Sequence, residues 1–175
     1  MKIALSLFIL TGLIYFNTLS SPFQFDDIPN IVNNSKIRDL KNFLDFSGTR
    51  YVGYLSFSMN YALHGFNVSG YHWGNLIIHA VNGFLVFYLV LLLLEVLGIH
   101  RSTLASNPFP ISPSWFASIV ALIFVAHPIQ TQAVSYIVQR FTSLATLFYL
   151  LTLILYLFWR LNHSRIRHPY LWYAA

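Results

Sequence analysis

Two adjacent acids, Asp26 and Asp27, stand out in a chain that has few acidic residues. The 175-residue sequence holds 5 Asp and Glu and is 57% hydrophobic. Adjacent carboxylates repel, and near an apolar surface the pKa of one of them rises. Such a group could accept the proton of an attacking hydroxyl, or the pair could hold a divalent cation. The dipeptide alone favours a turn or a helix cap, because Asp is a common N-cap and Pro29 follows.

Arg140 and Arg50 are the basic counterparts of these acids. Arg140 lies where the last long apolar run begins, and Arg50 lies in the loop that carries the acids. An arginine at a membrane boundary usually acts as an anchor that reaches the polar interface. A guanidinium is also well suited to hold a phosphate through two parallel hydrogen bonds. Both residues are therefore candidates for phosphate binding, with anchoring as the alternative.

Four polar side chains recur inside an otherwise apolar run, at His72, Asn75, His79 and Asn82. Their spacing of three, four and three residues places them on one face of a helix. Because unpaired polar groups are costly in lipid, this face must meet other helices or a wet cavity. Interhelical hydrogen bonding and the polar wall of an active-site cavity are both consistent with it. The two histidines lie roughly 10 Å apart along a helix, which disfavours one metal ion between them.

The composition predicts the kind of protein that positions these groups. Charged residues make up 9% of the chain, whereas soluble domains have about a quarter. The sequence is therefore typical of a membrane protein. Its basic residues are scattered between apolar runs, which argues against nucleic-acid binding. It has no cysteine, which excludes disulfides and thiolate metal sites.

The expected fold is an all-α polytopic membrane protein with a single membrane domain. A helix needs about 20 apolar residues to cross a bilayer. Four spans are expected, at about residues 3–19, 73–97, 115–138 and 141–161, and residues 169–175 begin another apolar segment. Pro128 should kink the third span at 127–128. The first span could be a cleaved signal peptide, but a retained anchor is favoured because further spans follow. The chain resembles the N-terminal piece of a longer protein, or a truncated copy.

The distribution of basic residues sets the expected orientation. The cluster at 160–168, RLNHSRIRH, adjoins a span and carries three arginines. Basic residues close to span ends favour the cytoplasmic side, so the N-terminus should be cytoplasmic. The outer loop at 20–70 and the turn at 127–140 then share the outer face. Within that loop, apolar residues at helical spacing between Leu55 and Phe66 predict a short helix in the membrane interface.

Three stretches in this order resemble a known enzyme family. They are FQFDDIPNIVNN, GFNVSGYHWGNLIIHAVNGFLVF and ALIFVAHPIQTQAVSYIVQRFTSLATLFYLL. Together they resemble the N-terminal part of GT-C superfamily membrane glycosyltransferases, within the tetratricopeptide-repeat-bearing, O-mannosyltransferase-like family. The resemblance implies a GT-C-like helical bundle. It also implies transfer of a sugar from a polyprenyl-phosphate donor to a protein or glycan hydroxyl, on the outer or lumenal face.

The same resemblance implies roles for individual residues. Asp26 or Asp27 would be the general base toward the acceptor, and Arg140 would neutralise the donor phosphate. His127, beside Pro128, and His79 would line the same cavity. These roles agree with the chemistry, since a hydroxyl nucleophile needs a base and a phosphate leaving group needs a cation.

The expected partners are the polyprenyl-phosphate lipid, an acceptor protein or glycan, and a larger membrane complex. Beyond a divalent cation at Asp26 and Asp27, no cofactor is expected. The expected location is a multi-pass position in a bacterial inner membrane, favoured by the absence of cysteine and the short loops, or in the endoplasmic reticulum of a eukaryote. The alternative function is a non-catalytic membrane subunit or scaffold that uses its polar stripe for interhelical contacts.

Overall fold

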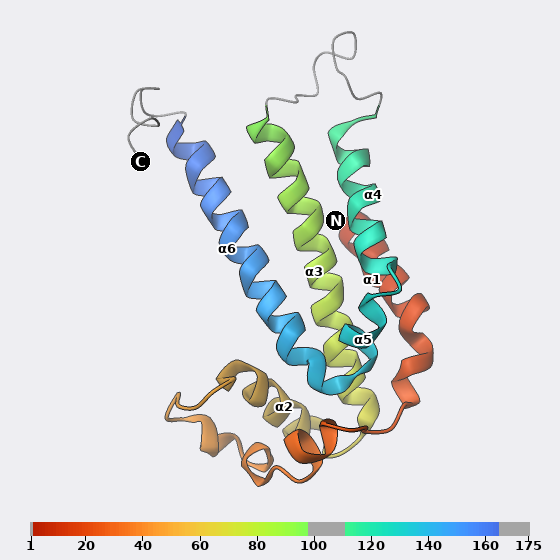
Figure 1. The fold of residues 1–175 in the computed structure, drawn as a ribbon, viewed down its shortest axis with the longest axis vertical. Coiled ribbons are helices and arrows are strands. Elements are labelled where there is room, and N and C mark those ends of the chain that lie inside the picture. Colours follow the sequence, from red (N-terminus) through yellow and green to blue (C-terminus); the bar gives the residue numbers. More distant parts are fainter. Residues whose placement is uncertain (1, 98–110, 165–175) are drawn as a thin grey trace.

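A central helix, α3, organises the chain. The structure is a computed structural model that describes residues 2–97 and 111–164, and within these ranges every regular element is helical. α3 spans Val68–Val96, and α6 spans Arg140–Ser164. Two 14-residue helices, α1 (Lys2–Tyr15) and α4 (Pro113–Ala126), lie on the other side of α3 (Figure 1). α3 packs against α1, α4 and α6, so its residues reach every other long element.

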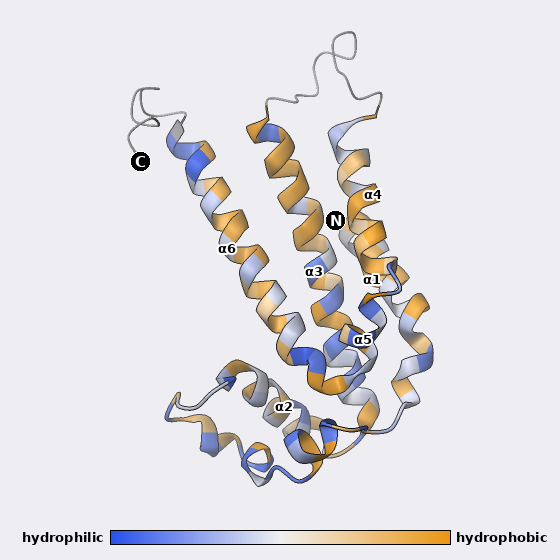
Figure 2. Cartoon of the chain, viewed as in Figure 1, coloured by the Kyte–Doolittle hydropathy of each residue, from blue (hydrophilic) through white to orange (hydrophobic). Residues whose placement is uncertain are grey.

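Two stretches are long and apolar enough to cross a membrane by length and composition, Val68–Val96 and Ile137–His163. Leu5–Ser20 and Pro113–Ala126 are apolar but shorter than the roughly 20 residues of a full span. Figure 2 shows hydrophobic residues, in orange, along α3, α4 and α6. The described chain thus has two candidate spans where the sequence predicted four. The segment at 169–175 and the part of the basic cluster after residue 164 lie outside the described residues.

The chain breaks sharply after α4, at the position where the sequence predicted a kink. His127 is extended, with φ −66° and ψ 130°, as expected for the residue before a proline. A six-residue helix, α5 (Gln130–Ser135), and a 3₁₀ turn (Ile137–Gln139) follow, and α6 then begins at Arg140. A compact turn therefore replaces the second half of the helix that was expected over residues 115–138.

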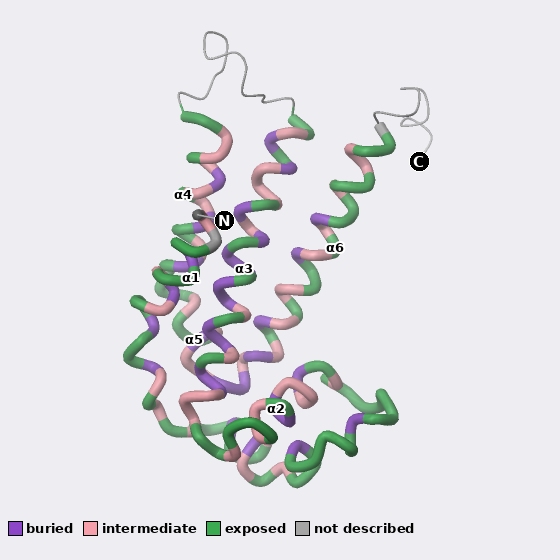
Figure 3. Tube along the Cα trace, turned by 180° about the vertical axis from the view of Figure 1, so that it is seen from behind, coloured by how far each residue is buried: buried purple, intermediate pink, exposed green. Residues whose placement is uncertain are grey.

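Residues 20–70 form a compact cap at the same end of the helices as this turn (Figure 1). The cap contains a π-helical turn (Ile28–Val32), two 3₁₀ turns (Ser35–Arg38 and Leu40–Phe43) and α2 (Tyr51–His64). One buried cluster joins it to α3 and the turn, made of Ile31, Ile37, Phe43, Phe57, Tyr71 and Ile137. Figure 3 shows buried segments in both the cap and the facing part of α3. The cap and the turn therefore fold as one unit.

α2 agrees in position with the helix predicted over residues 55–66. Its packed side includes Gly53 and Phe57, while Val52, Met59 and Leu63 are exposed. These three apolar residues lie seven and four positions apart, which places them on one helix face. The cap thus presents an apolar stripe to its surroundings.

Candidate active site

Asp27 is buried, and its carboxylate joins two segments that are far apart in the sequence. Oδ2 accepts the backbone N–H of Gln24 at 3.0 Å, and Oδ1 accepts that of Val138 at 2.7 Å. The side chain is 1% exposed. Burial raises the pKa of Asp27 above its ordinary value, and the two N–H donors oppose this rise without cancelling it. Asp27 thereby fastens the start of the cap to the turn before α6.

Asp26 has a different environment, although it is the neighbouring residue. Its side chain is exposed, and its carboxylate accepts no hydrogen bond from a described residue. Its backbone is fixed, because its N–H donates to the hydroxyl of Tyr136 at 2.8 Å and its carbonyl accepts from Asn30 Nδ2 at 2.7 Å. Asp26 therefore has an exposed carboxylate on a backbone that is held by two hydrogen bonds.

A cavity of about 680 Å³ lies between the segment that carries the acids and the turn after α4. This volume falls within the range of ordinary small-molecule sites. The cavity is lined by Ser21, Pro22, Gln24, Phe25, Asp27, Pro128, Ile129, Thr131, Gln132, Ser135 and Tyr136. None of these lining residues is Lys or Arg, so the wall offers a carboxylate, hydroxyls, amides and two aromatic rings.

Arg140 lies at the same end of the helices but does not line this cavity. It is 1% exposed. Its Nε donates to Asn75 Oδ1 at 2.7 Å, and its Nη2 donates to the carbonyl of Tyr71 at 2.7 Å. Its Nη1 donates to Asn60 Oδ1 at 2.5 Å, and the guanidinium lies 4.6 Å from the centre of the Phe57 ring. The donors of Arg140 are thus committed to neutral groups within the protein.

The burial of Arg140 depends on residues that sequence reasoning did not identify. Gly74 on α3 leaves the space for the guanidinium, because a Cβ added there would lie 2.6 Å from Nη2. Asn60 also binds the carbonyl of Gly70 through its Nδ2, at 3.1 Å. A glycine inside a long apolar helix is the only sequence signal of this close approach.

The polar stripe of α3 is buried, and each of its four side chains bonds to a backbone carbonyl of another segment. His72 Nε2 lies 3.0 Å from the carbonyl oxygen of Ser21, and His79 Nε2 lies 3.2 Å from that of Val125. Asn82 Nδ2 donates to the carbonyl of Ser143 at 3.0 Å. The Ser21 carbonyl follows the first apolar helical segment and the Val125 carbonyl lies in the last turn of α4, whereas the Ser143 carbonyl lies in the first turn of α6.

Asn75 is the most connected member of the stripe. Its Nδ2 donates to the carbonyls of Val134 and Ile137, each at 3.2 Å, and its Oδ1 accepts from Arg140. Neither Asn75 nor its three partners on the stripe is among the residues that line the cavity. Asn75 instead stabilises the turn between α4 and α6, because it donates to two of the turn's backbone carbonyls, which need donors in an apolar setting.

Two further residues that the sequence proposed for the site lie elsewhere. His127 is exposed, and its Nδ1 accepts the N–H of Ile129 at 3.2 Å, so it caps the turn and does not line the cavity. Arg50 is exposed, begins α2 with a positive φ of 55°, and lies over the Phe141 ring at 5.0 Å. It borders a separate cavity of about 320 Å³ between α2 and α6.

The acids do not form a metal cluster with other side chains in the part of the chain that the structure describes. No group of three or more His, Asp or Glu residues that could hold an ion is found there. A divalent cation at Asp26 and Asp27 would have to compete with the two backbone N–H groups on Asp27.

Comparison with curated proteins finds significant relatives. The chain is 30% identical over 160 residues to human "Protein O-mannosyl-transferase TMTC2", an alignment that covers 82% of this chain and 17% of that protein. It is 32% identical over 187 residues to Drosophila melanogaster Tmtc2, with 94% of this chain and 18% of that protein covered. A Caenorhabditis elegans protein O-mannosyl-transferase is 33% identical over 158 residues, with coverages of 81% and 21%.

The chain thus spans about a fifth of the length of these relatives. No protein-family model matches it, and no solved structure matches it with significance. The relatives named above are animal proteins, so they lend no support to the expectation of a bacterial source. The resemblance that the three sequence stretches indicated is confirmed: this chain's curated homologues are the TMTC protein O-mannosyl-transferases.

Proposed function

We propose that the chain forms the acid-bearing part of a membrane glycosyltransferase, which moves a mannosyl group from a polyprenyl-phosphate donor to a protein hydroxyl. The family relationship supports transfer of mannose, because the printed names of the homologues state that activity. The candidate spans support a membrane location. The acceptor hydroxyl and the lipid donor are the partners of the proposed site, and a larger membrane complex is its setting.

One observation carries this proposal: Asp26 has an exposed carboxylate with no hydrogen-bond donor among the described residues, and both of its neighbours, Phe25 and Asp27, line the cavity, although Asp26 is not itself a lining residue. In the proposed reaction, Asp26 accepts the proton of the acceptor hydroxyl. The hydroxyl oxygen forms the new bond to C1 of the sugar as the bond from C1 to the phosphate oxygen breaks. The phosphate leaves with the bonding electrons, and Asp26 ends protonated. Asp27 acts as the positioning residue that holds this segment against the turn.

The donor phosphate needs a cation, and the buried hydrogen bonds of Arg140 make it a poor choice. Arg50 is exposed and borders an apolar cavity between α2 and α6, so it remains a candidate among the described residues. Residues beyond 1–175 are the other source of a cation. Arg140 supports the site by fixing α6 to α3 and α2.

The proposed membrane arrangement follows from the shared end of the cap and the turn. α3 and α6 cross the bilayer, and α1 and α4 complete a four-helix, GT-C-like bundle. The cap lies on the outer or lumenal face, and the exposed apolar stripe of α2 lies in the interface. The N-terminus is then cytoplasmic. This arrangement places Asp26 at the surface where a lipid-linked sugar and a protein acceptor can meet.

The test measures mannose transfer by membranes containing the whole protein to which this chain belongs. Asp26→Asn should reduce transfer by at least about a hundredfold, the usual contribution of a general base, with unchanged protein level. Asp45→Asn is the matched control, because Asp45 is an exposed acid of the same cap whose sequence neighbours do not line the cavity, unlike those of Asp26. Full transfer by Asp26→Asn would overturn the proposal.

A second function, that of a non-catalytic scaffold, is favoured by the polar stripe, whose side chains serve backbone contacts. Purification of the whole protein with a stable membrane partner, combined with transfer that is indifferent to Asp26, would support that function.

A further inference from the structure

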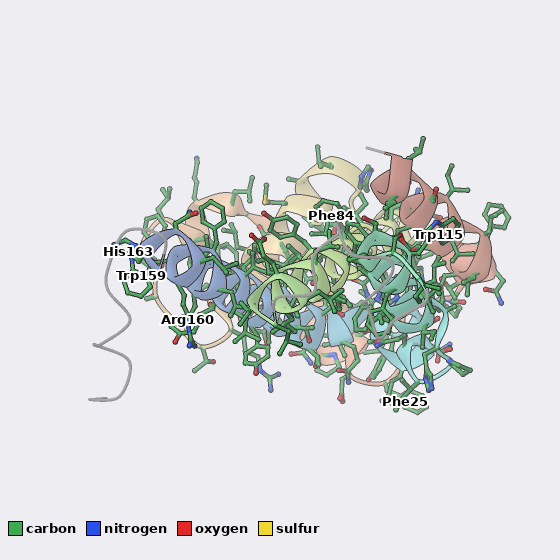
Figure 4. The ribbon with its side chains drawn as sticks, turned by 90° about the horizontal axis from the view of Figure 1, so that it is seen from above. Phe25, Phe84, Trp115, Trp159, Arg160 and His163 are labelled. Carbon is green, nitrogen blue, oxygen red and sulfur yellow. The ribbon has the colours of Figure 1, made fainter. Side chains whose placement is uncertain are left out.

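Phe25, the residue before the two acids, combines an unfavourable backbone with an exposed ring. Its φ is 44°, a region that few non-glycine residues adopt and that is costly for a bulky side chain. Its side chain is 81% exposed, so core packing does not repay this strain. Figure 4 shows the labelled ring at the periphery of the molecule. Neither local preference nor burial accounts for the position of Phe25.

The surrounding contacts hold this conformation firmly. Asp27 N–H donates to the carbonyl of Gln24 at 2.8 Å, and Ile28 N–H donates to that of Phe25 at 3.1 Å. The Phe25 ring meets the Tyr136 ring edge to face, with centroids 6.5 Å apart, and both residues line the 680 Å³ cavity. The Tyr136 hydroxyl in turn accepts the N–H of Asp26. The two rings therefore form an aromatic wall beside the candidate base.

The polar part of the cavity complements this wall. The side chains of Gln24, Thr131 and Gln132 line it, are exposed, and make no hydrogen bond to any residue that the structure describes. Two amides and a hydroxyl next to aromatic rings match a pyranose ring, which has an apolar face of C–H groups and an edge of hydroxyls. A phosphate fits poorly, because the lining has no Lys or Arg and includes Asp27.

We propose that Phe25 and Tyr136 form the sugar-binding wall of this cavity. The Phe25 ring contacts the C–H face of the hexose that is transferred, and Gln24, Thr131 and Gln132 bind its hydroxyls. The contact fixes the sugar beside Asp26 and offsets the backbone strain at Phe25 when the site is occupied. This assignment rests on the proposed function and adds the residues that recognise the sugar.

The test compares three substitutions at Phe25 with a matched control. Phe46 is also a phenylalanine with positive φ, at 51°, is also 81% exposed, and also lies against a tyrosine, Tyr51, but it does not line the cavity. The KM for a polyprenyl-phosphate mannose donor is measured in membranes with the whole protein. Binding of methyl α-mannopyranoside to the purified protein is followed by saturation-transfer NMR.

Phe25→Ala and Phe25→Leu should raise the KM about threefold to tenfold, the value of a well-placed aromatic contact, and should weaken the mannoside signal. Phe25→Trp should retain the parental KM and the parental mannoside signal, because tryptophan also has an aromatic face. Phe46→Ala should match the parent protein. Phe25→Leu separates ring contact from simple apolar character, so a leucine variant with parental KM and mannoside signal would overturn the proposal.

Asp26→Asn separates this inference from the function on which it rests. We expect it to lose transfer and keep the mannoside signal. If it loses transfer while every Phe25 variant keeps parental KM and mannoside binding, the sugar wall is wrong and the glycosyltransferase stands. If it keeps full transfer while Phe25→Ala loses the mannoside signal, the assigned chemistry fails and the sugar wall stands.

Discussion

The Oδ1 atom of Asp27 lies 2.7 Å from the backbone nitrogen of Val138, across 111 residues of sequence. This bond joins the start of the cap to the turn that leads into Arg140. The two acids therefore differ, because this bond engages the Asp27 carboxylate, whereas the Asp26 carboxylate is exposed.

Asp27→Ala should destabilise the protein, because it leaves the N–H groups of Val138 and Gln24 without their acceptor. A buried unsatisfied donor costs about 1–3 kcal/mol. Asp26→Ala, at an exposed position, should stay within about 0.5 kcal/mol of the parent. Thermal unfolding in detergent measures both, and equal losses in the two variants would contradict the division of roles.

The pH dependence of stability should change sign between two acids of the cap. The folded pKa of Asp27 is raised, so the folded state binds more protons and the free energy of unfolding falls as pH rises through the raised pKa. The pKa of Asp45 is lowered by hydrogen bonds from Ser47, so its contribution is lost as pH falls. The melting-temperature gap between parent and Asp27→Asn should shrink from pH 4 upward, about the unfolded pKa. The gap for Asp45→Asn should instead grow as pH rises from the lowered pKa of Asp45 to about pH 4 and stay constant above it. A gap that follows the same trend in both variants would refute the assignment.

Gly74→Ala should be destabilising although alanine is the better helix former. The added Cβ would lie 2.6 Å from Nη2 of Arg140, and that guanidinium is held by several hydrogen bonds. Overpacking of this kind costs about 1–3 kcal/mol. Gly12 of α1 is the control, since nothing lies within 4 Å of its added Cβ, and Gly12→Ala should gain about 0.5–1 kcal/mol. Melting temperatures that rise in both variants would show that Arg140 is not fixed.

Two asparagines of the same stripe should differ in importance. Asn75→Leu removes the acceptor of Arg140 Nε and the donor to two carbonyls, so we expect little folded protein. Asn82 makes one bond, to Ser143, and its buried Oδ1 has no partner, so Asn82→Leu should change stability by no more than about 0.6 kcal/mol. Size-exclusion profiles and melting temperatures measure the loss of folded protein in each variant. A severe loss in Asn82→Leu alone would reverse the ranking.

Arg140→Lys should lower the amount of folded protein and leave the donor KM of the remaining enzyme unchanged. A lysine has three donors and cannot reproduce the spread of bonds to Asn60, Tyr71 and Asn75. Arg50→Lys, at an exposed residue, should have the opposite profile, with normal stability and an altered KM. A stable Arg140→Lys protein with a raised KM would return the phosphate-binding role to Arg140.

The sequence by itself determined the local features of this protein. Neighbouring residues alone predict three features: the acid pair after the first apolar run, the polar stripe of α3 and the break at Pro128. Helical periodicity and the restriction before proline act over a few positions. The family relationship was also readable, because the three stretches keep their order and composition.

The tertiary structure decided which of these groups are available. Asp26 and Asp27 look alike in sequence, but only folding brings Val138 to one of them and leaves the other exposed. The sequence predicted that Arg140 binds a phosphate. In the structure Arg140 is instead enclosed by Gly74 and Asn75 of α3 and Asn60 of α2. Nothing in the sequence indicated that Phe25 lines the cavity, because the position of its ring depends on contact with Tyr136, which lies far along the chain. Such partners lie tens of residues apart, so their contacts depend on how the helices pack and on which backbone groups remain to be satisfied.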